Sequence, residues 1–142
     1  MFGRHNKLNI EWLRTVAFFA GFTDAELEEV ASDGEREEIK AGALLVDQGR
    51  FADKCFVIVE GSANVFISGD YVATVNAGSM VGEMALVEHR PRNASVVAET
   101  DLVVVSFGIP QFKELLDRSP HTRARVLDLL NKRAVENIER RE

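Results

Sequence analysis

Glycines divide the middle of the chain into short apolar segments, and this pattern constrains the fold more than any other feature. The segments between the glycines are rich in Val, Ile, Phe and Ala. Short runs of such residues, separated by turn signals at this spacing, predict an all-β sandwich or barrel. The dividing glycines are Gly34, Gly42, Gly49, Gly61, Gly69, Gly78 and Gly82.

Several of the predicted strands are apolar at consecutive positions, as expected where both faces of a sheet are covered. A jelly roll, or double-stranded β-helix, flanked by helices satisfies this pattern, and we expect about eight strands. Ser68-Gly69-Asp70 predicts a tight hairpin between two of them. The predicted strands are Leu44–Val46, Cys55–Val59, Ala63–Ile67, Tyr71–Val75, Ser95–Ala98 and Leu102–Phe107.

Helical signals precede the β region, and residues 9–33 are predicted to be helical. Asn9 can cap a first helix with an apolar stripe of Ile10, Leu13, Val16 and Ala17. Thr23-Asp24-Ala25-Glu26 forms a capping box, in which Thr23 accepts from the Glu26 amide and the Glu26 side chain reaches back to the Thr23 amide. Phe22 and Leu27 occupy the positions of a hydrophobic staple, and this second helix is expected to end near Asp33-Gly34.

Helical signals return after Gly108. Pro110 suits a first helical turn, and Ser119-Pro120 is a second start signal. The pattern predicts one domain over residues 1–142, with helices at about 9–33, a β-roll at about 35–108 and helices at about 110–140. The last helix would pack on its own domain or form a homodimer through the terminal helices. Its apolar stripe comprises Val126, Leu129, Leu130, Ala134 and Ile138.

Composition limits the classes of partner. The chain has 142 residues, of which 46% are hydrophobic, and a formal net charge of -6, which suits one acidic globular domain rather than a nucleic-acid binder. The single cysteine, Cys55, has no partner for an internal disulfide and is interpreted as a buried apolar residue. No apolar run reaches membrane-spanning length, and the N-terminus lacks a signal-peptide pattern, so we expect no membrane insertion and a cytoplasmic location.

The segment from Gly82 to Ser95 carries the chemistry. Gly82 permits a sharp turn and close approach of a ligand, and the helix-forming residues Glu83-Met84-Ala85-Leu86 can present unpaired amides to an anion. The guanidinium of Arg92 can grip two phosphate oxygens. A carboxylate at Glu83 would be repelled by a phosphate but can accept a hydrogen bond from a ribose hydroxyl. Together these groups suit a sugar phosphate.

At these residues the sequence resembles the cyclic nucleotide-binding domain family, of the stand-alone bacterial type with a roll like that of the cAMP receptor protein. The family's phosphate-binding cassette runs Gly-Glu-x-Ala-Leu, a short spacer, then x-Arg-x-Ala-Ser/Thr. This chain has Gly82-Glu83-Met84-Ala85-Leu86 and then Pro91-Arg92-Asn93-Ala94-Ser95. The resemblance extends over roughly residues 16–130.

The resemblance implies a role for each matching residue. Glu83 would take the ribose 2′-hydroxyl, and Arg92 would pair with the cyclic phosphate. The amides of Met84 and Ala85 would cradle phosphate oxygens, Val81 and Gly82 would line the floor near the sugar, and Ala94 completes the motif. The implied ligand is cAMP or cGMP, with no other cofactor and no metal.

Asn93 departs from the family pattern, in which the residue after the arginine is often Ala or Ser in cAMP binders and Thr in cGMP binders. Its amide can donate to a phosphate oxygen or to a purine edge. We expect a small preference for cAMP, because adenine tolerates an apolar surround such as Val81, Val72 and Val65 better than guanine does.

Other interpretations remain open at this point. Glu83 and Arg92 could form a structural ion pair, or the fold could have lost its ligand and serve as a protein-interaction module. The chain could also be the regulatory piece of a larger channel, kinase or regulator. We expect no enzyme: His5, His89 and His121 are too scattered for a metal site and are interpreted as surface residues, and no Ser or Cys has a base beside it in a motif. We expect no DNA-binding helix-turn-helix after the roll, and the sequence leaves the identity of a protein partner open.

Overall fold

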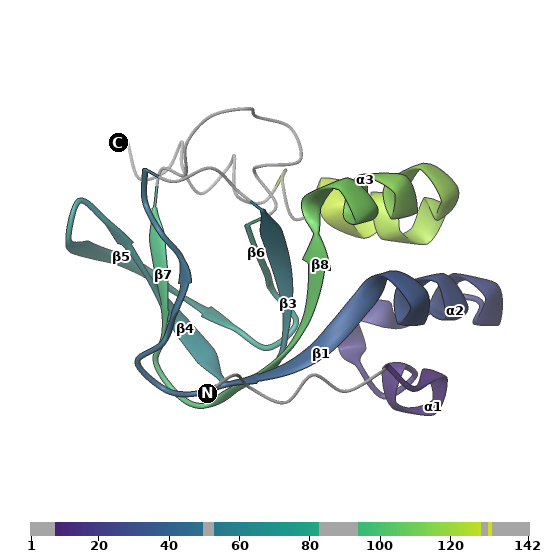
Figure 1. The fold of residues 1–142 in the computed structure, drawn as a ribbon, viewed down its shortest axis with the longest axis horizontal. Helices are drawn as coiled ribbons and strands as arrows, with labels where there is room; N and C mark the ends of the chain where they lie inside the picture. Colours follow the sequence, from purple (N-terminus) through teal and green to yellow (C-terminus); the bar gives the residue numbers. More distant parts are fainter. Residues whose placement is uncertain (1–7, 50–52, 83–93, 129–130, 132–142) are drawn as a thin grey trace.

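Two four-stranded antiparallel sheets face each other across an apolar interior in the computed structural model (Figure 1). The structure describes residues 8–49, 53–82, 94–128 and 131. One sheet has the order β1-β8-β3-β6 and the other the order β2-β7-β4-β5. Their bounds are Gly34–Ile39 for β1, Leu44–Val46 for β2, Lys54–Glu60 for β3, Ser62–Ile67 for β4, Asp70–Asn76 for β5, Met80–Val81 for β6, Ser95–Ala98 for β7 and Leu102–Gly108 for β8.

The predicted strands and the jelly-roll class are confirmed. Each predicted run forms a strand, extended by at most one residue at either end. The hairpin at Ser68-Gly69 is confirmed as well: Ile67 pairs with Asp70, and the two turn residues have φ of 52° and 84°. Two consecutive positive φ values suit the right-handed twist of the flanking strands, which is why a glycine follows a small polar residue here.

The first sheet is covered on both faces, which explains its consecutive apolar positions. Along β3, Cys55 and Val57 belong to the cluster beneath the helices, whereas Phe56 and Ile58 belong to the cluster inside the roll. Side chains on a strand alternate between faces, so a strand between two apolar layers must be apolar throughout. The prediction that Cys55 is buried is confirmed.

Three short helical elements pack against the outer face of this sheet (Figure 1). They are α1 (Ile10–Leu13), the 3₁₀ helix η1 (Ala17–Phe19) and α2 (Asp24–Asp33). The predicted cap at Asn9 and the capping box at Thr23 are both present. The prediction that α1 continues through Val16 and Ala17 is wrong: the amide and hydroxyl of Thr15 both donate to the Trp12 carbonyl, at 2.9 and 2.6 Å, which tightens the chain and ends the helix.

The C-terminal helices begin where the sequence indicates. Helix α3 (Ile109–Arg118) has Pro110 in its first turn. Residues 120–128 form a further helix, whose first turn is capped by the fully buried Ser119: its hydroxyl accepts from the Thr122 amide at 3.2 Å. Val126 is buried, whereas Leu129, Leu130, Ala134 and Ile138 lie outside the described residues.

Strand β1 was not predicted, since Gly-Glu-Arg-Glu-Glu-Ile has little of the β-branched or aromatic content of a strand. It forms because β8 supplies a partner for all of its residues, from Gly34 opposite Phe107 to Ile39 opposite Leu102. A β-carbon at Gly34 would lie 2.7 Å from the Phe107 ring, so the strand can approach this ring only with a glycine there.

Candidate functional site

The ends of β2 and β6 and the start of β7 lie at one end of the roll (Figure 1). Residues 47–53 join the end of β2 to the start of β3, and residues 82–94 join the end of β6 to the start of β7. Val46 pairs with Val96 in one sheet and Phe56 with Val81 in the other, and the common apolar cluster of these four residues brings the strand ends together. We call this region, formed by the end of β2, the end of β6 and the start of β7, the cassette end of the roll.

Valine side chains line the interior at the cassette end. Val46, Val81 and Val96 are all at most 6% exposed and belong to one apolar cluster, against which Val65 and Val75 pack. Val81 is therefore part of the apolar interior at this end of the roll. The sequence suggested Val65 and Val72 as part of an apolar surround for the base; Val65 packs against this cluster, and so does Val75, which was not predicted.

Gly82 begins the connection in the left-handed region, with φ of +86°. Residues with a β-carbon rarely adopt this conformation, so the turn after β6 favours glycine. Ala94, partly buried, ends the connection just before β7. Of the predicted site residues, Val81, Gly82 and Ala94 thus lie at the cassette end, while Glu83, Met84, Ala85, Arg92 and Asn93 lie outside the described residues and stay predictions.

A chain of hydrogen bonds that sequence reasoning missed crosses the cassette end. Ser95 Oγ accepts from the backbone N–H of Gln48 at 2.9 Å, and the Gln48 Oε1 atom accepts from the backbone N–H of Ser68 at 2.8 Å. These residues are 47 and 20 positions apart. No local pattern identifies such contacts, although Gln48 stands beside the turn glycine Gly49.

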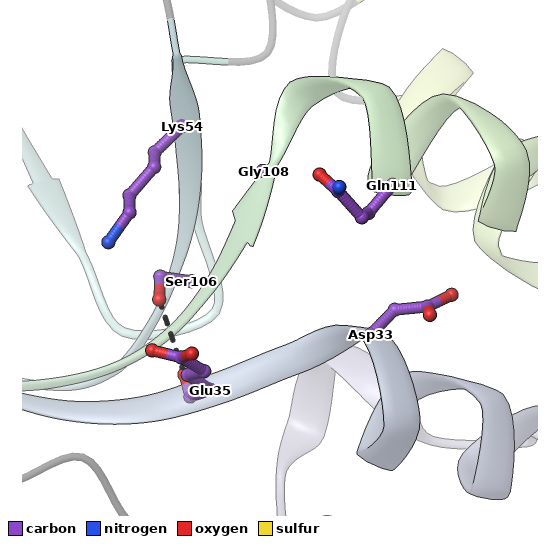
Figure 2. Close-up of a pocket in the computed structure, with 6 residues that line it drawn as sticks. All are labelled: Asp33, Glu35, Lys54, Ser106, Gly108 and Gln111. Atoms are coloured by element: carbon purple, nitrogen blue, oxygen red, sulfur yellow. Dashed lines mark hydrogen bonds between the residues drawn. The ribbon is translucent and has the colours of Figure 1, made fainter.

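A polar hollow of about 270 Å³ lies elsewhere, between the α2–β1 junction and the start of α3 (Figure 2). Asp33 in its wall pairs with Arg118 at 3.3 Å, and the Ser106 hydroxyl donates to the Glu35 carbonyl at 3.5 Å. Its walls carry two carboxylates and the single ammonium of Lys54, which makes it a poor place for a phosphate. The hollow is therefore a poorer candidate than the cassette end for the predicted sugar-phosphate site.

A buried carboxylate joins the two helical segments. Glu26 accepts hydrogen bonds from Thr23, from the Ser119 hydroxyl at 2.7 Å and from the His121 amide, and it lies 2.7 Å from His121 Nδ1. Burial by itself raises the pKa of Glu26, but the hydrogen bonds from Ser119, Thr23 and His121 outweigh it and hold that pKa at about 2. The prediction that His121 is a simple surface residue is incomplete, since one of its ring nitrogens contacts Glu26.

Within the described ranges, no three His, Cys, Asp or Glu side chains gather as a metal site would require. The helices in those ranges include none with the length and apolar character needed to cross a membrane.

The sequence model of one family, the cyclic nucleotide-binding domain, matches residues 36–119, which is more than half of the chain. This range contains seven complete strands and both connections of the cassette end. The chain belongs to this family.

Relatives with known structures share the fold of this cyclic nucleotide-binding domain. A cyclic nucleotide-binding domain from Methylobacillus flagellatus is 26% identical with a TM-score of 0.75, over 92% of this chain and 79% of that one. The regulatory domain of Toxoplasma gondii PKA, crystallised with cAMP, is 31% identical with a TM-score of 0.69, over 89% of this chain and 48% of that one.

Among relatives compared by sequence, a cGMP-dependent protein kinase of Toxoplasma gondii is 34% identical over 78% of this chain and 11% of its own length.

In six of the curated relatives that it matches, the chain spans between 11% and 36% of the relative's own length. These relatives also include a cyclic nucleotide-gated potassium channel of Rhizobium etli. The matched part is thus one module that recurs in proteins of different overall activity.

Proposed function

We propose that this domain binds a cyclic nucleotide at the cassette end of the roll and acts as a ligand-sensing regulatory module. The observation that carries the proposal is the placement of the Gly82–Ser95 connection. Its described ends are Gly82, which has a positive φ, and Ser95, which begins β7, and the neighbouring strand residues Val81 and Val96 belong to one apolar cluster inside the roll. An apolar pocket with a few convergent polar groups is the usual form of a small-molecule site.

The chemistry of the connection supplies those polar groups. We infer that Arg92 pairs with the cyclic phosphate and that Glu83 accepts from the ribose 2′-hydroxyl, while the Met84 and Ala85 amides receive phosphate oxygens. The valines of the cassette end then offer the purine an apolar surface. Arg92 and Glu83 would thus recognise the part that cAMP and cGMP share.

The preferred base is adenine, by a small margin. Discrimination between the two nucleotides must come from groups near the purine edge, and the described candidates there are apolar. If the Asn93 oxygen faced the base, cGMP would gain about one hydrogen bond, on the order of 0.5–1.5 kcal/mol. We propose instead that the Asn93 NH₂ is directed to the phosphate. The names of the relatives include both nucleotides, so they favour neither.

Calorimetric titration with cAMP and with cGMP tests the proposal, first on the wild-type chain and then on two variants. Arg92→Ala should weaken binding by on the order of 2–5 kcal/mol, because the phosphate loses its charge-assisted partner. Glu83→Gln should weaken it by about 1–3 kcal/mol, since the ribose hydroxyl then meets an uncharged acceptor.

Two results would argue against this function. A folded wild-type chain that binds neither nucleotide would favour the interpretation of a fold that has lost its ligand. A Glu83→Gln variant that unfolds, with unchanged affinity per folded molecule, would favour a structural ion pair between Glu83 and Arg92.

A further inference from the structure

The contact between Ser95 and Gln48 lies where the β2–β7 ladder has already ended. The last ladder pair of these two strands is Val46 with Val96, and the register shifts just before it. Beyond that pair, the Gln48 amide donates to the Ser95 side chain and not to a backbone carbonyl. A side-chain hydroxyl therefore continues the contact between the two segments past the end of the sheet.

Ser95 is also the first residue that β7 pairs on its other side, opposite Phe66 of β4. Its backbone thus belongs to one ladder, while its hydroxyl faces the segment that follows β2. These two restraints fix both the position and the direction with which the chain enters β7.

Gln48 extends this restraint to a third segment. Its side-chain oxygen accepts from the Ser68 amide at 2.8 Å, and its side-chain nitrogen lies 3.5 Å from the Ser68 hydroxyl. Ser68 begins the β4–β5 turn and has a φ of 52°, a conformation that few residues adopt without support. The start of β7, the segment after β2 and the β4–β5 turn are therefore linked through one glutamine.

We propose that Ser95 and Gln48 are positioning residues for the ligand site, acting through the entry of the connection into β7. The proposal rests on the proposed function. Arg92 precedes Ser95 by only three residues, so a change in the entry of β7 passes to it along a short covalent link. A displacement of about 1 Å suffices to weaken a charge-assisted contact that depends on geometry.

The test compares Ser95→Ala with Ser95→Thr, which keeps the hydroxyl, and with Ser62→Ala as a matched control. Ser62 lies at the opposite end of the same sheet and is also partly buried, and its hydroxyl donates to Glu99 Oε2 at 3.2 Å. Titration with cAMP gives the dissociation constant, displacement of a fluorescent cAMP analogue by unlabelled cAMP gives the dissociation rate, and urea unfolding gives the stability of each variant.

We expect Ser95→Ala to raise the dissociation constant about threefold to tenfold, mainly through faster dissociation, because one hydrogen bond is lost. Ser95→Thr should stay within about twofold of the wild type. Ser62→Ala should lose a similar amount of stability with unchanged affinity, which separates positioning from a general loss of stability. Gln48→Ala, which removes the link to Ser68, should shift the dissociation rate in the same direction as Ser95→Ala.

The outcomes separate the two proposals. A wild-type chain that binds cAMP, with both Ser95→Ala and Gln48→Ala within about twofold of its affinity, would overturn this inference alone. Equal loss of affinity in Ser62→Ala and Ser95→Ala would overturn it too, since position in the sheet would then not matter. A wild-type chain without affinity for either nucleotide would overturn the proposed function, and this inference with it.

Discussion

Replacement of Glu26 by glutamine tests the hydrogen bonds that connect the N-terminal and C-terminal helical segments. Glu26 is 9% exposed, and its carboxylate accepts from donors 93 and 95 residues away in the chain. Glutamine keeps one acceptor oxygen, but it presents an NH₂ group where the second oxygen stood and carries no charge. The Ser119 hydroxyl and the His121 amide then share a weaker acceptor, or one of them has no acceptor.

The magnitude follows from the pKa of Glu26, which is about 2 in the folded chain against an ordinary 4.5. The difference corresponds to about 3 kcal/mol of stability near pH 7. Because the folded-state pKa lies below the unfolded-state pKa, this stability is fully present above about pH 5 and is lost as the pH falls through 4.5 towards 2. At pH 3 about 2 kcal/mol of it should already be gone.

The assay is urea unfolding at pH 7 and at pH 3, monitored by the fluorescence of Trp12, which packs against the apolar cluster beneath the helices. We expect Glu26→Gln to be less stable than the wild type by about 2 kcal/mol at pH 7, with a clearly smaller difference at pH 3. Glu28→Gln, an exposed change on the same helix, should stay within about 0.5 kcal/mol. A wild-type advantage that is the same at both pH values would refute the assignment of this stability to the Glu26 charge.

Three further predictions concern the backbone, the core and the base. Gly61→Ala should destabilise the domain by more than Gly21→Ala in urea unfolding, because both glycines have positive φ but only Gly61 faces a close backbone carbonyl. The backbone cost common to both variants is about 1–3 kcal/mol. Equal losses of stability would show that the carbonyl moves away without cost. Leu115 is fully buried, so Leu115→Ala should lower the unfolding free energy by about 2–5 kcal/mol. Leu127 is 52% exposed, and Leu127→Ala should lower it by less than about 1 kcal/mol. Similar losses in the two variants would contradict the assigned core. Competition of labelled cAMP by cGMP should give a dissociation constant for cAMP that is lower by less than about tenfold. A lower constant for cGMP that reverses in Asn93→Ala would mean that the Asn93 oxygen faces the base.

Several features of this domain could be predicted from the sequence because neighbouring residues decide them. The Thr23–Glu26 capping box and the Ser68-Gly69 turn depend on residues at most three positions apart. Consecutive apolar residues in β3 and β8 indicate sheets covered on both faces whatever their neighbours are. The cassette motif is likewise continuous along the chain, so its residues alone were enough to indicate the family.

Tertiary structure decided what depends on distant partners. The polar strand β1 exists because β8 offers it a complete ladder, and Val16 lies outside α1 because Thr15 turns back on Trp12. Glu26 shows both cases in one side chain. Its capping partner is three residues away and was predicted, whereas the Ser119 hydroxyl is 93 residues away and was not. Local patterns specify which conformation a segment prefers, but only the packed chain brings Glu26 to Ser119, or Gln48 to Ser95, because contacts of this range arise from the arrangement of whole strands and helices.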